Sequence, residues 1–128
     1  MTQRPVRILL IEDSEADTIL ATRVLQQFDV DIETANDAEA AERLLFEQGL
    51  RPELILLDLS LPGVHGLDVL RKIKNDARTQ DVKVVIVTGN EAEQIAMKAY
   101  NLRCDGIVHK PITLDSVREL LRKMRDEE

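Results

Sequence analysis

The stretch LILLD at residues 54–58 decides the fold, because four consecutive apolar residues lead to a single carboxylate, Asp58. An apolar run of this kind indicates a strand that is covered on both faces, as in a parallel sheet flanked by helices. The sequence LSLPG follows at residues 59–63, so Asp58 stands at the carboxyl end of the predicted strand. Open α/β sheets bind their ligands at that end. Asp58 is therefore the first candidate functional residue.

Other apolar runs also end in polar side chains. ILLI is followed by the acids Glu12 and Asp13, VVIV by the hydroxyl of Thr88, and IVH by the ammonium of Lys110. If these runs are neighbouring parallel strands, three carboxylates, one hydroxyl and one ammonium meet at the same rim of the sheet. Such a set of groups can hold a divalent cation and a phosphoryl group.

Predicted strands and helices alternate along the whole chain. The strands span Arg7 to Glu12, Val30 to Ala35, Leu54 to Asp58, Lys83 to Thr88 and Gly106 to His109. The helices span Ser14 to Gln27, Asn36 to about Gln48, Val64 to Asn75, Glu91 to about Leu102, and a last segment that begins at Thr113. This alternation predicts an α/β fold with a doubly wound five-stranded parallel sheet of order 2-1-3-4-5, which is the flavodoxin-like order.

Short polar residues mark the predicted helix starts. Ser14 followed by Asp17 indicates a capping box for the first helix. Asn36 followed by Glu39 indicates the cap of the second helix. On this interpretation Asp17 is only a charge at a helix N-terminus and takes no part in the site.

The charge balance argues against a nucleic-acid-binding protein. The formal net charge is −7, from 17 basic and 24 acidic residues, whereas a nucleic-acid surface needs clustered Lys and Arg on one face. The basic residues gather at Arg71–Lys74 and Arg122–Arg125. Both clusters are interpreted as solvated faces and last turns of helices, where cations suit the helix dipole.

Length and composition indicate one globular domain of 128 residues. No apolar stretch approaches the roughly 20 residues that span a bilayer, and the start of the chain lacks the apolar stretch of a secretory signal. We therefore predict a cytoplasmic protein. Cys104 is the single cysteine, which excludes an internal disulfide and favours a small buried apolar residue.

Three carboxylates at one rim repel one another, so we expect at least one of their pKa values to be raised. A hard divalent cation relieves this repulsion. Carboxylate, carbonyl and water oxygens are the ligands that Mg²⁺ prefers.

These residues, in this order, resemble the receiver domain of two-component response regulators from about Arg7 to Met124. The linked motifs that carry the resemblance are Glu12-Asp13, Asp58 with Leu61-Pro62 and Gly66, Thr88, and Lys110-Pro111. Each motif alone is weak, but their combination on alternating strands and helices is specific.

The resemblance implies that Asp58 accepts a phosphoryl group from a phosphohistidine of a sensor histidine kinase or phosphotransfer protein, or from a small acyl phosphate. It implies that Asp13, Asp58 and the carbonyl of Ser60 hold Mg²⁺, with Mn²⁺ as a possible substitute, and that Glu12 holds a metal-bound water. Lys110 pairs with one phosphoryl oxygen and Thr88 with another. The peptide bond before Pro111 is expected to be cis.

The resemblance also implies a signalling protein without enzymatic turnover of other molecules, with no nucleic-acid or membrane partner. We expect residues 1–128 to form a single receiver domain without an output domain, which switches its surface to bind a target protein and could form a homodimer. There are two alternatives. The chain could be a receiver excised from a longer hybrid kinase or regulator, or a degenerate receiver that acts as an interaction module without phosphorylation. A haloacid dehalogenase-type phosphatase is disfavoured because Ser60 stands where that family needs a second aspartate.

Three positions depart from the family pattern. Ile107 stands where an aromatic residue usually couples to the threonine, so we expect the usual two-step side-chain rotation to be weakened. His65 replaces a common acid, and Glu12 replaces an aspartate.

Overall fold

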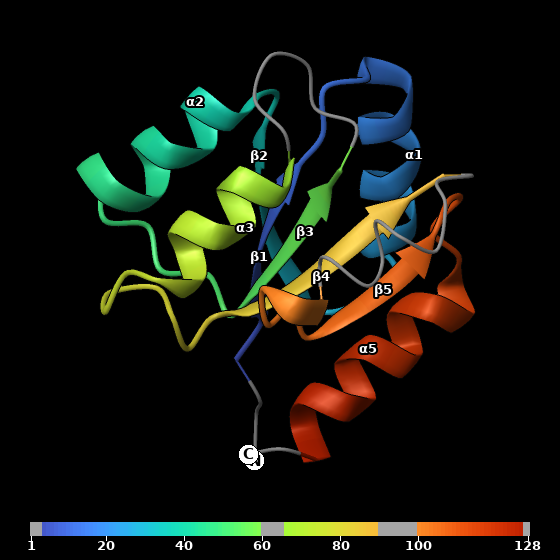
Figure 1. The fold of residues 1–128 in the computed structure, drawn as a ribbon. Coiled ribbons are helices and arrows are strands. Elements are labelled where there is room, and N and C mark those ends of the chain that lie inside the picture. The colour runs from blue at the N-terminus through green and yellow to red at the C-terminus, as the bar shows by residue number, and fades with distance from the viewer. Residues whose placement is uncertain (1–3, 60–65, 90–99, 127–128) are drawn as a thin grey trace.

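A computed structural model of the chain describes residues 4–59, 66–89 and 100–126. Its centre is a parallel five-stranded sheet of order β2-β1-β3-β4-β5 (Figure 1). The strands are β1 (Val6–Ile11), β2 (Val30–Ala35), β3 (Leu54–Asp58), β4 (Lys83–Thr88) and β5 (Gly106–His109). The predicted order is confirmed, and four of the strands have the predicted bounds. The first strand begins and ends one residue earlier than predicted, which leaves Glu12 just beyond it.

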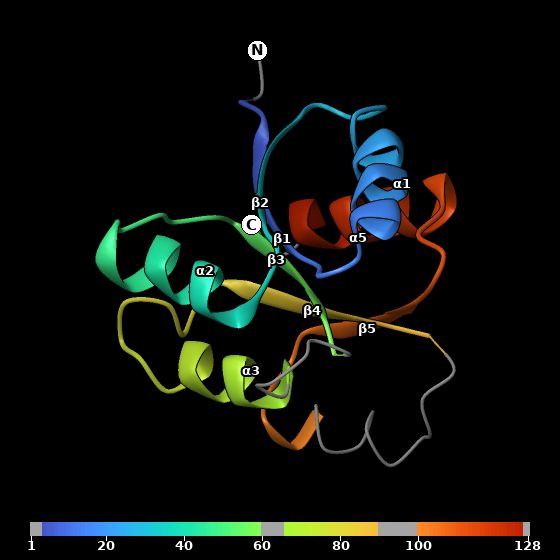
Figure 2. The same cartoon turned by 90° about the horizontal axis from the view of Figure 1, so that it is seen from above.

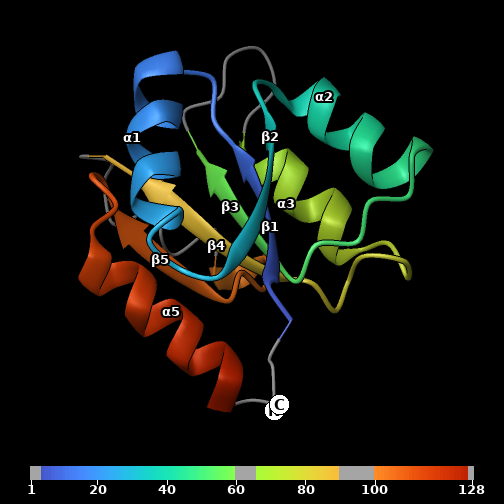
Figure 3. The same cartoon turned by 180° about the vertical axis from the view of Figure 1, so that it is seen from behind.

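The described helices are α1 (Glu15–Leu25), α2 (Ala38–Glu42), α3 (Gly66–Lys74) and α5 (Leu114–Asp126), and a π-helical turn, η1 (Arg43–Glu47), continues α2. Figure 2 shows α1 and α5 on one face of the sheet and α2 and α3 on the other. The view from behind in Figure 3 shows α1 and α5 in front of the strands. The first helix is shorter than predicted at both ends, with Ser14 as its cap. None of the helices in these ranges is long and apolar enough to cross a membrane.

The capping predictions are partly confirmed. The Ser14 hydroxyl accepts the backbone N–H of Asp17 at 3.2 Å, and Thr113 and Ser116 cap α5 reciprocally. The prediction for Asn36 is wrong, because Asp37 is the cap and its carboxylate accepts the backbone N–H of Ala40 at 2.7 Å. A helix that begins one residue later places two of its alanines in the core.

Two other helix predictions fall partly on residues that the structure does not describe. Of the helix predicted from Glu91 to Leu102, residues 100 and 101 are helical and the residues before them lie outside the described ranges. The predicted start of the third helix at Val64 lies outside them too, while its end at Lys74 is one residue short of the prediction.

Two hydrophobic layers enclose the sheet. Side chains alternate along the strands, so Ile55 and Leu57 belong to the layer under α2 and α3, whereas Leu54 and Leu56 belong to the layer under α1 and α5. All five residues of β3 are buried, as expected for a central strand with helices on both sides. The edge strand β2 is mostly exposed or half-buried. This construction leaves the strand ends as the places where polar side chains gather.

Lys74 contradicts the interpretation of the basic cluster at Arg71–Lys74 as a fully solvated face. Its side chain is only 7% exposed, and its ammonium lies 2.8 Å from the Asp105 carboxylate. It also donates to the carbonyl oxygens of Gln80 and Val82. The same Asp105 oxygen accepts the backbone N–H of Val84 at 2.8 Å. A polar network around the buried Lys74 side chain therefore joins the end of α3 to the starts of β4 and β5.

We expect Lys74→Met to lower the free energy of unfolding by about 2–3 kcal/mol, because the change removes the 2.8 Å ion pair with Asp105 and leaves two carbonyls without their donor. Urea denaturation measures the loss. The matched control is Lys72→Met on the same helix, whose ammonium forms an exposed ion pair and whose loss should cost less than about 1 kcal/mol. Equal losses for the two variants would contradict the assigned role of Lys74.

Candidate functional site

The candidate site lies at the carboxyl ends of the strands. Asp58 is the last residue of β3, and Thr88 is the last residue of β4. Glu12 follows β1, and Lys110 follows β5, where its backbone N–H donates to the Thr88 carbonyl at 2.7 Å. Because β1, β3, β4 and β5 are consecutive neighbours in the sheet, four of the predicted site residues lie along one rim. Thr88 is buried.

The ammonium of Lys110 is the centre of the site. It lies 3.0 Å from Glu12 Oε1 and 3.1 Å from Asp58 Oδ2. The side chains of Glu12 and Asp58 are only 5% and 2% exposed, so each has lost most of its hydration. A buried carboxylate needs a cation or hydrogen-bond donors, and Lys110 supplies both to each of them.

Asp17 is the site residue that the sequence did not reveal. Its Oδ2 atom lies 3.0 Å from the Lys110 ammonium, so the interpretation of Asp17 as only a helix-terminal charge is wrong. In a capping box its carboxylate would turn back to the backbone N–H of Ser14, but that N–H donates to Glu12 Oε2 instead. Residues 17 and 110 are far apart in the chain, and no spacing rule connects them. One signal in the sequence pointed to this contact. Lys110 was expected at the rim, and a lysine there can attract an acid from the first turn of α1, such as Asp17.

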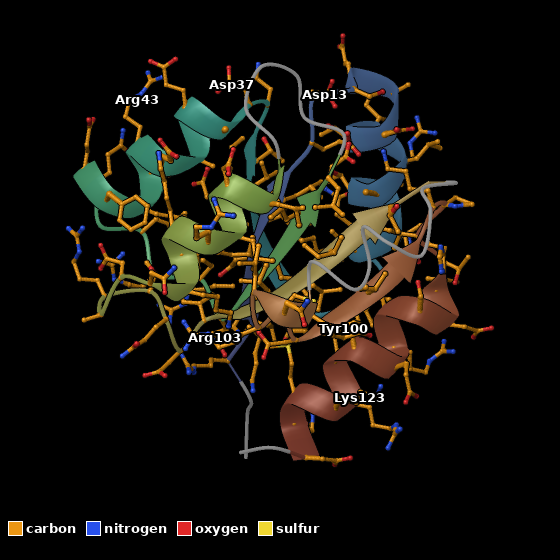
Figure 4. All side chains as sticks on the ribbon, viewed as in Figure 1. Asp13, Asp37, Arg43, Tyr100, Arg103 and Lys123 are labelled. Atoms are coloured by element: carbon orange, nitrogen blue, oxygen red, sulfur yellow. The ribbon has the colours of Figure 1, made fainter. Side chains whose placement is uncertain are left out.

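The acids of the site include a group that could hold a metal ion. Single carboxylate oxygens of Glu12, Asp13 and Asp58 lie within 4.8 Å of one another. Asp13 is exposed, and Figure 4 shows it at the rim beside the start of α1. Ligands on opposite sides of an octahedral Mg²⁺ ion are about 4 Å apart, so small side-chain rotations would bring these oxygens to coordination distance. The donor set therefore fits a hard divalent cation. The fourth predicted ligand, Ser60, lies outside the described residues.

A cleft of about 370 Å³ opens at this rim. Its polar wall contains Glu12, Asp17, Asp58 and Lys110. Part of its apolar wall comes from α1 and from the segment after β5, namely Leu20, Ala21, Pro111 and Ile112. The peptide bond between Lys110 and Pro111 is cis, as the resemblance implied. The cleft gives a small anion access to Asp58 while one side remains apolar.

Gly66, the first residue of α3, packs directly against the end of β3. A Cβ atom at this position would lie 2.8 Å from Leu59 Cα and 3.0 Å from the Asp58 carbonyl oxygen. Such contacts are too close for any other residue without movement of the backbone. Gly66 thus allows α3 to begin against the residue that follows the strand, which helps to fix the position of Asp58.

The pKa values of the site reflect burial and close charges. Burial, with a hydrogen bond to Asp58, raises the pKa of the Glu12 carboxyl from 4.5 to about 8, although the bond from Lys110 acts in the opposite direction. Burial lowers the pKa of the Lys110 ammonium, but its bonds with the three carboxylates outweigh burial and raise that pKa above its ordinary value. The prediction of one raised carboxyl pKa is confirmed, but burial contributes more than repulsion.

Cys104 is buried, as expected, and burial raises the pKa of its thiol. Ile107 packs against the hydrophobic layer under α2 and α3. His109 is exposed, whereas His65 lies outside the described residues. Tyr100 is 56% exposed, so most of its ring surface is open to solvent.

In metal-free buffer we expect the free energy of unfolding to fall as the pH rises from about 5 to 8. Folded Glu12 keeps its proton up to about pH 8, whereas the unfolded chain loses it near pH 4.5. The folded state therefore binds more protons across this window, and its stability falls by up to about 1 kcal/mol per pH unit.

Chemical denaturation at a series of pH values, with chelator present, measures this slope. Glu12→Gln has no carboxyl to titrate, so its stability should change less over the same window. Parallel curves for the wild type and Glu12→Gln would show that Glu12 does not carry a raised pKa.

Comparison with known proteins gives a consistent result. The family model described as "Response regulator receiver domain" matches residues 8–122. Response regulator Rcp1 of Synechocystis sp. is 34% identical over 125 residues, which cover 92% of this chain and 85% of Rcp1. The transcriptional regulator RpaA of the same organism is 32% identical over 121 residues, which cover 91% of this chain but only 49% of RpaA. The chain thus spans about half the length of RpaA.

Solved structures agree with these sequence matches. The structure of the phosphorylated cyanobacterial phytochrome response regulator RcpA superposes with a TM-score of 0.80 at 27% identity, over 95% of this chain and 92% of RcpA. The Mn²⁺-bound form of response regulator Rcp1 superposes with a TM-score of 0.75 at 33% identity, over 94% of this chain and 92% of Rcp1.

Proposed function

The chain belongs to the response regulator receiver domain family, and from this membership we propose that it accepts a phosphoryl group on the carboxylate of Asp58. The observation that carries the proposal is the setting of Asp58. Its side chain is 2% exposed, ends a central parallel strand, and lies 3.1 Å from the Lys110 ammonium. This carboxylate lines the cleft together with Glu12 and Lys110, and phosphoryl transfer depends on such positioned charges.

The proposed reaction is an in-line displacement. A carboxylate oxygen of Asp58 forms a bond to phosphorus while the bond from phosphorus to the donor breaks, and the donor leaves with that electron pair. The donor is the phosphohistidine of a sensor histidine kinase or phosphotransfer protein, or a small acyl phosphate. The leaving group is then the imidazole nitrogen or the carboxylate, respectively. The product is an aspartyl phosphate.

The surrounding residues have separate roles in this proposal. Lys110 neutralises one phosphoryl oxygen as a compact charge, and the Thr88 hydroxyl donates to another. Glu12, Asp13 and Asp58, with the carbonyl of Ser60, are the groups that would hold the cation. When bound, this cation would neutralise negative charge between Asp58 and the phosphoryl oxygens. We propose Mg²⁺, with Mn²⁺ as a substitute, because the Rcp1 structure holds Mn²⁺ and the three acids offer only hard oxygen ligands.

The consequence of phosphorylation in this proposal is a change of surface that a target protein recognises. A new phosphoryl group attracts Thr88 and Lys110. This attraction shifts the equilibrium between the conformations of the segments that follow β4 and β5. Ile107 cannot form the hydrogen bond that an aromatic hydroxyl would offer. We therefore expect the change to depend on Thr88 more than on β5.

We expect the wild type to gain the mass of one phosphoryl group when it is incubated with acetyl phosphate and Mg²⁺, and Asp58→Asn to gain none, because an amide cannot replace the attacking carboxylate. Intact-mass spectrometry measures both. Asp31→Asn is the matched control, since Asp31 is exposed near the start of the edge strand β2, at the opposite end of the sheet from Asp58. Stoichiometric labelling of Asp58→Asn, or full-rate labelling in excess chelator, would contradict the proposal.

A second prediction concerns the cation. Mg²⁺ at about 100 times its dissociation constant should stabilise the wild type by about 2.7 kcal/mol, because it binds the folded state alone. Asp13→Asn should gain clearly less, since one ligand has lost its charge. Without metal, Asp13→Asn should be at least as stable as the wild type, because one member of a repelling cluster is gone.

Melting curves over a MgCl₂ series at constant ionic strength measure these shifts, and Asp31→Asn again serves as the control for a lost charge. If Asp13→Asn and the wild type respond equally to Mg²⁺, Asp13 is not a ligand.

A further inference from the structure

The Lys110 ammonium contacts three carboxylates, and one of them stands apart. Glu12 and Asp58 belong to the group that could hold a metal ion, together with Asp13. Asp17 does not belong to it, although its Oδ2 atom is as close to the ammonium, at 3.0 Å, as any other partner. Its ion pair with Lys110 therefore has no part in metal binding.

Asp17 is held firmly at the mouth of the cleft. It lies in the first turn of α1, where its backbone N–H is bound by the Ser14 hydroxyl. The Thr18 hydroxyl donates to the Ser14 carbonyl at 2.9 Å and tightens the same turn. The side chain lines the cleft. Its carboxylate thus holds the ammonium of Lys110 from the side of α1, at 3.0 Å.

A lysine ammonium has three N–H donors, and the carboxyl oxygens of Asp17, Glu12 and Asp58 at 3.0–3.1 Å accept them. A phosphoryl oxygen can bind the ammonium only when one carboxylate gives up its bond. The exposed fractions decide which one: the side chain of Asp17 is 42% exposed, whereas those of Glu12 and Asp58 are 5% and 2% exposed. An exposed carboxylate regains water, while a buried one stays without a partner at high cost.

We propose that Asp17 is a positioning residue that holds Lys110 toward α1 in the unphosphorylated protein and competes with the phosphoryl group for its ammonium, and so slows phosphorylation. This inference rests on the proposed phosphorylation of Asp58. Asp17 touches none of the reacting atoms and acts only through Lys110. Its negative charge at the mouth also opposes the approach of an anionic donor.

The test uses the full chain with acetyl phosphate as the donor. In the reaction, an Asp58 oxygen bonds to phosphorus, the bond between phosphorus and the acetyl oxygen breaks, and acetate leaves with the electron pair. Initial labelling rates are measured by intact mass at saturating Mg²⁺ over a series of acetyl phosphate concentrations. Asp17→Asn removes the charge that competes for Lys110 and should raise kcat/KM about two- to fivefold, the range that corresponds to a partly exposed ion pair. The gain should appear mainly in KM, because Lys110 contacts the donor before transfer.

Two further variants separate this role from other effects. Glu15→Gln removes the same charge from the same turn of α1, but Glu15 is exposed and is not among the residues that line the cleft, so its kcat/KM should stay near the wild-type value. Asp17→Glu restores a carboxylate and should return the rate toward that of the wild type. Melting temperatures identify any variant whose fold is weakened, and Asp17→Ser replaces Asp17→Asn if the latter is weakened.

The proposal is overturned if Asp17→Asn is labelled at the wild-type rate or more slowly, or if Glu15→Gln is accelerated as much. It is also overturned if Asp17→Glu stays as fast as Asp17→Asn. A wild type that is not labelled at all contradicts the proposed function itself. A labelled wild type with an unchanged Asp17→Asn variant contradicts only the role of Asp17.

Discussion

The ion-pair cluster around the Lys110 ammonium is the interaction on which the site depends. Two of its carboxylates are almost completely buried, and burial of a carboxylate without a partner costs several kcal/mol. One compact charge at 3.0–3.1 Å from three acids offsets this cost. Glu12 follows β1, Asp17 lies in α1, Asp58 ends β3 and Lys110 follows β5. The same cluster therefore connects four parts of the rim.

The parallel sheet makes this cluster possible. Adjacent parallel strands end at the same edge, so side chains that follow β1, β3, β4 and β5 meet without any long loop to carry them. The hydrophobic layers on both faces exclude water from below. The acids are therefore held in a fixed arrangement before any ligand arrives, and a preorganised set of charges is what phosphoryl transfer requires.

The two ends of the sheet hold different polar networks. At the carboxyl end, the acids outnumber the cation, and the excess negative charge suits a divalent ion. At the opposite end, the Asp105 carboxylate is shared by the ammonium groups of Lys74 and Lys83, and backbone groups complete the network. The first network has excess negative charge that a bound cation can neutralise, whereas in the second network the charged groups already have partners. This difference explains why Lys74 and Lys110 serve different purposes in one small fold.

The sequence by itself determined the sheet order, the position of four strands and the rim on which the site lies. Apolar runs and their polar ends are local signals, and the parallel arrangement follows from the alternation of strands and helices. The residue types at the strand ends also identified Glu12, Asp13, Asp58, Thr88 and Lys110 as candidates. That residues 1–128 form one domain without an output domain stays a prediction.

Only the tertiary structure decided which partners the charged side chains of Asp17 and Lys74 contact. The local pattern assigned Asp17 to a helix cap and Lys74 to a solvated face, but each carries its charge to a partner that lies far away in the chain, Lys110 and Asp105 respectively. The π-helical turn after α2 was equally hidden, and within it the Leu45 carbonyl accepts a hydrogen bond from Arg51. Periodicity records which face of an element is buried. It does not record which of several nearby charges a flexible side chain will reach, since that choice depends on burial and geometry that exist only in the folded protein.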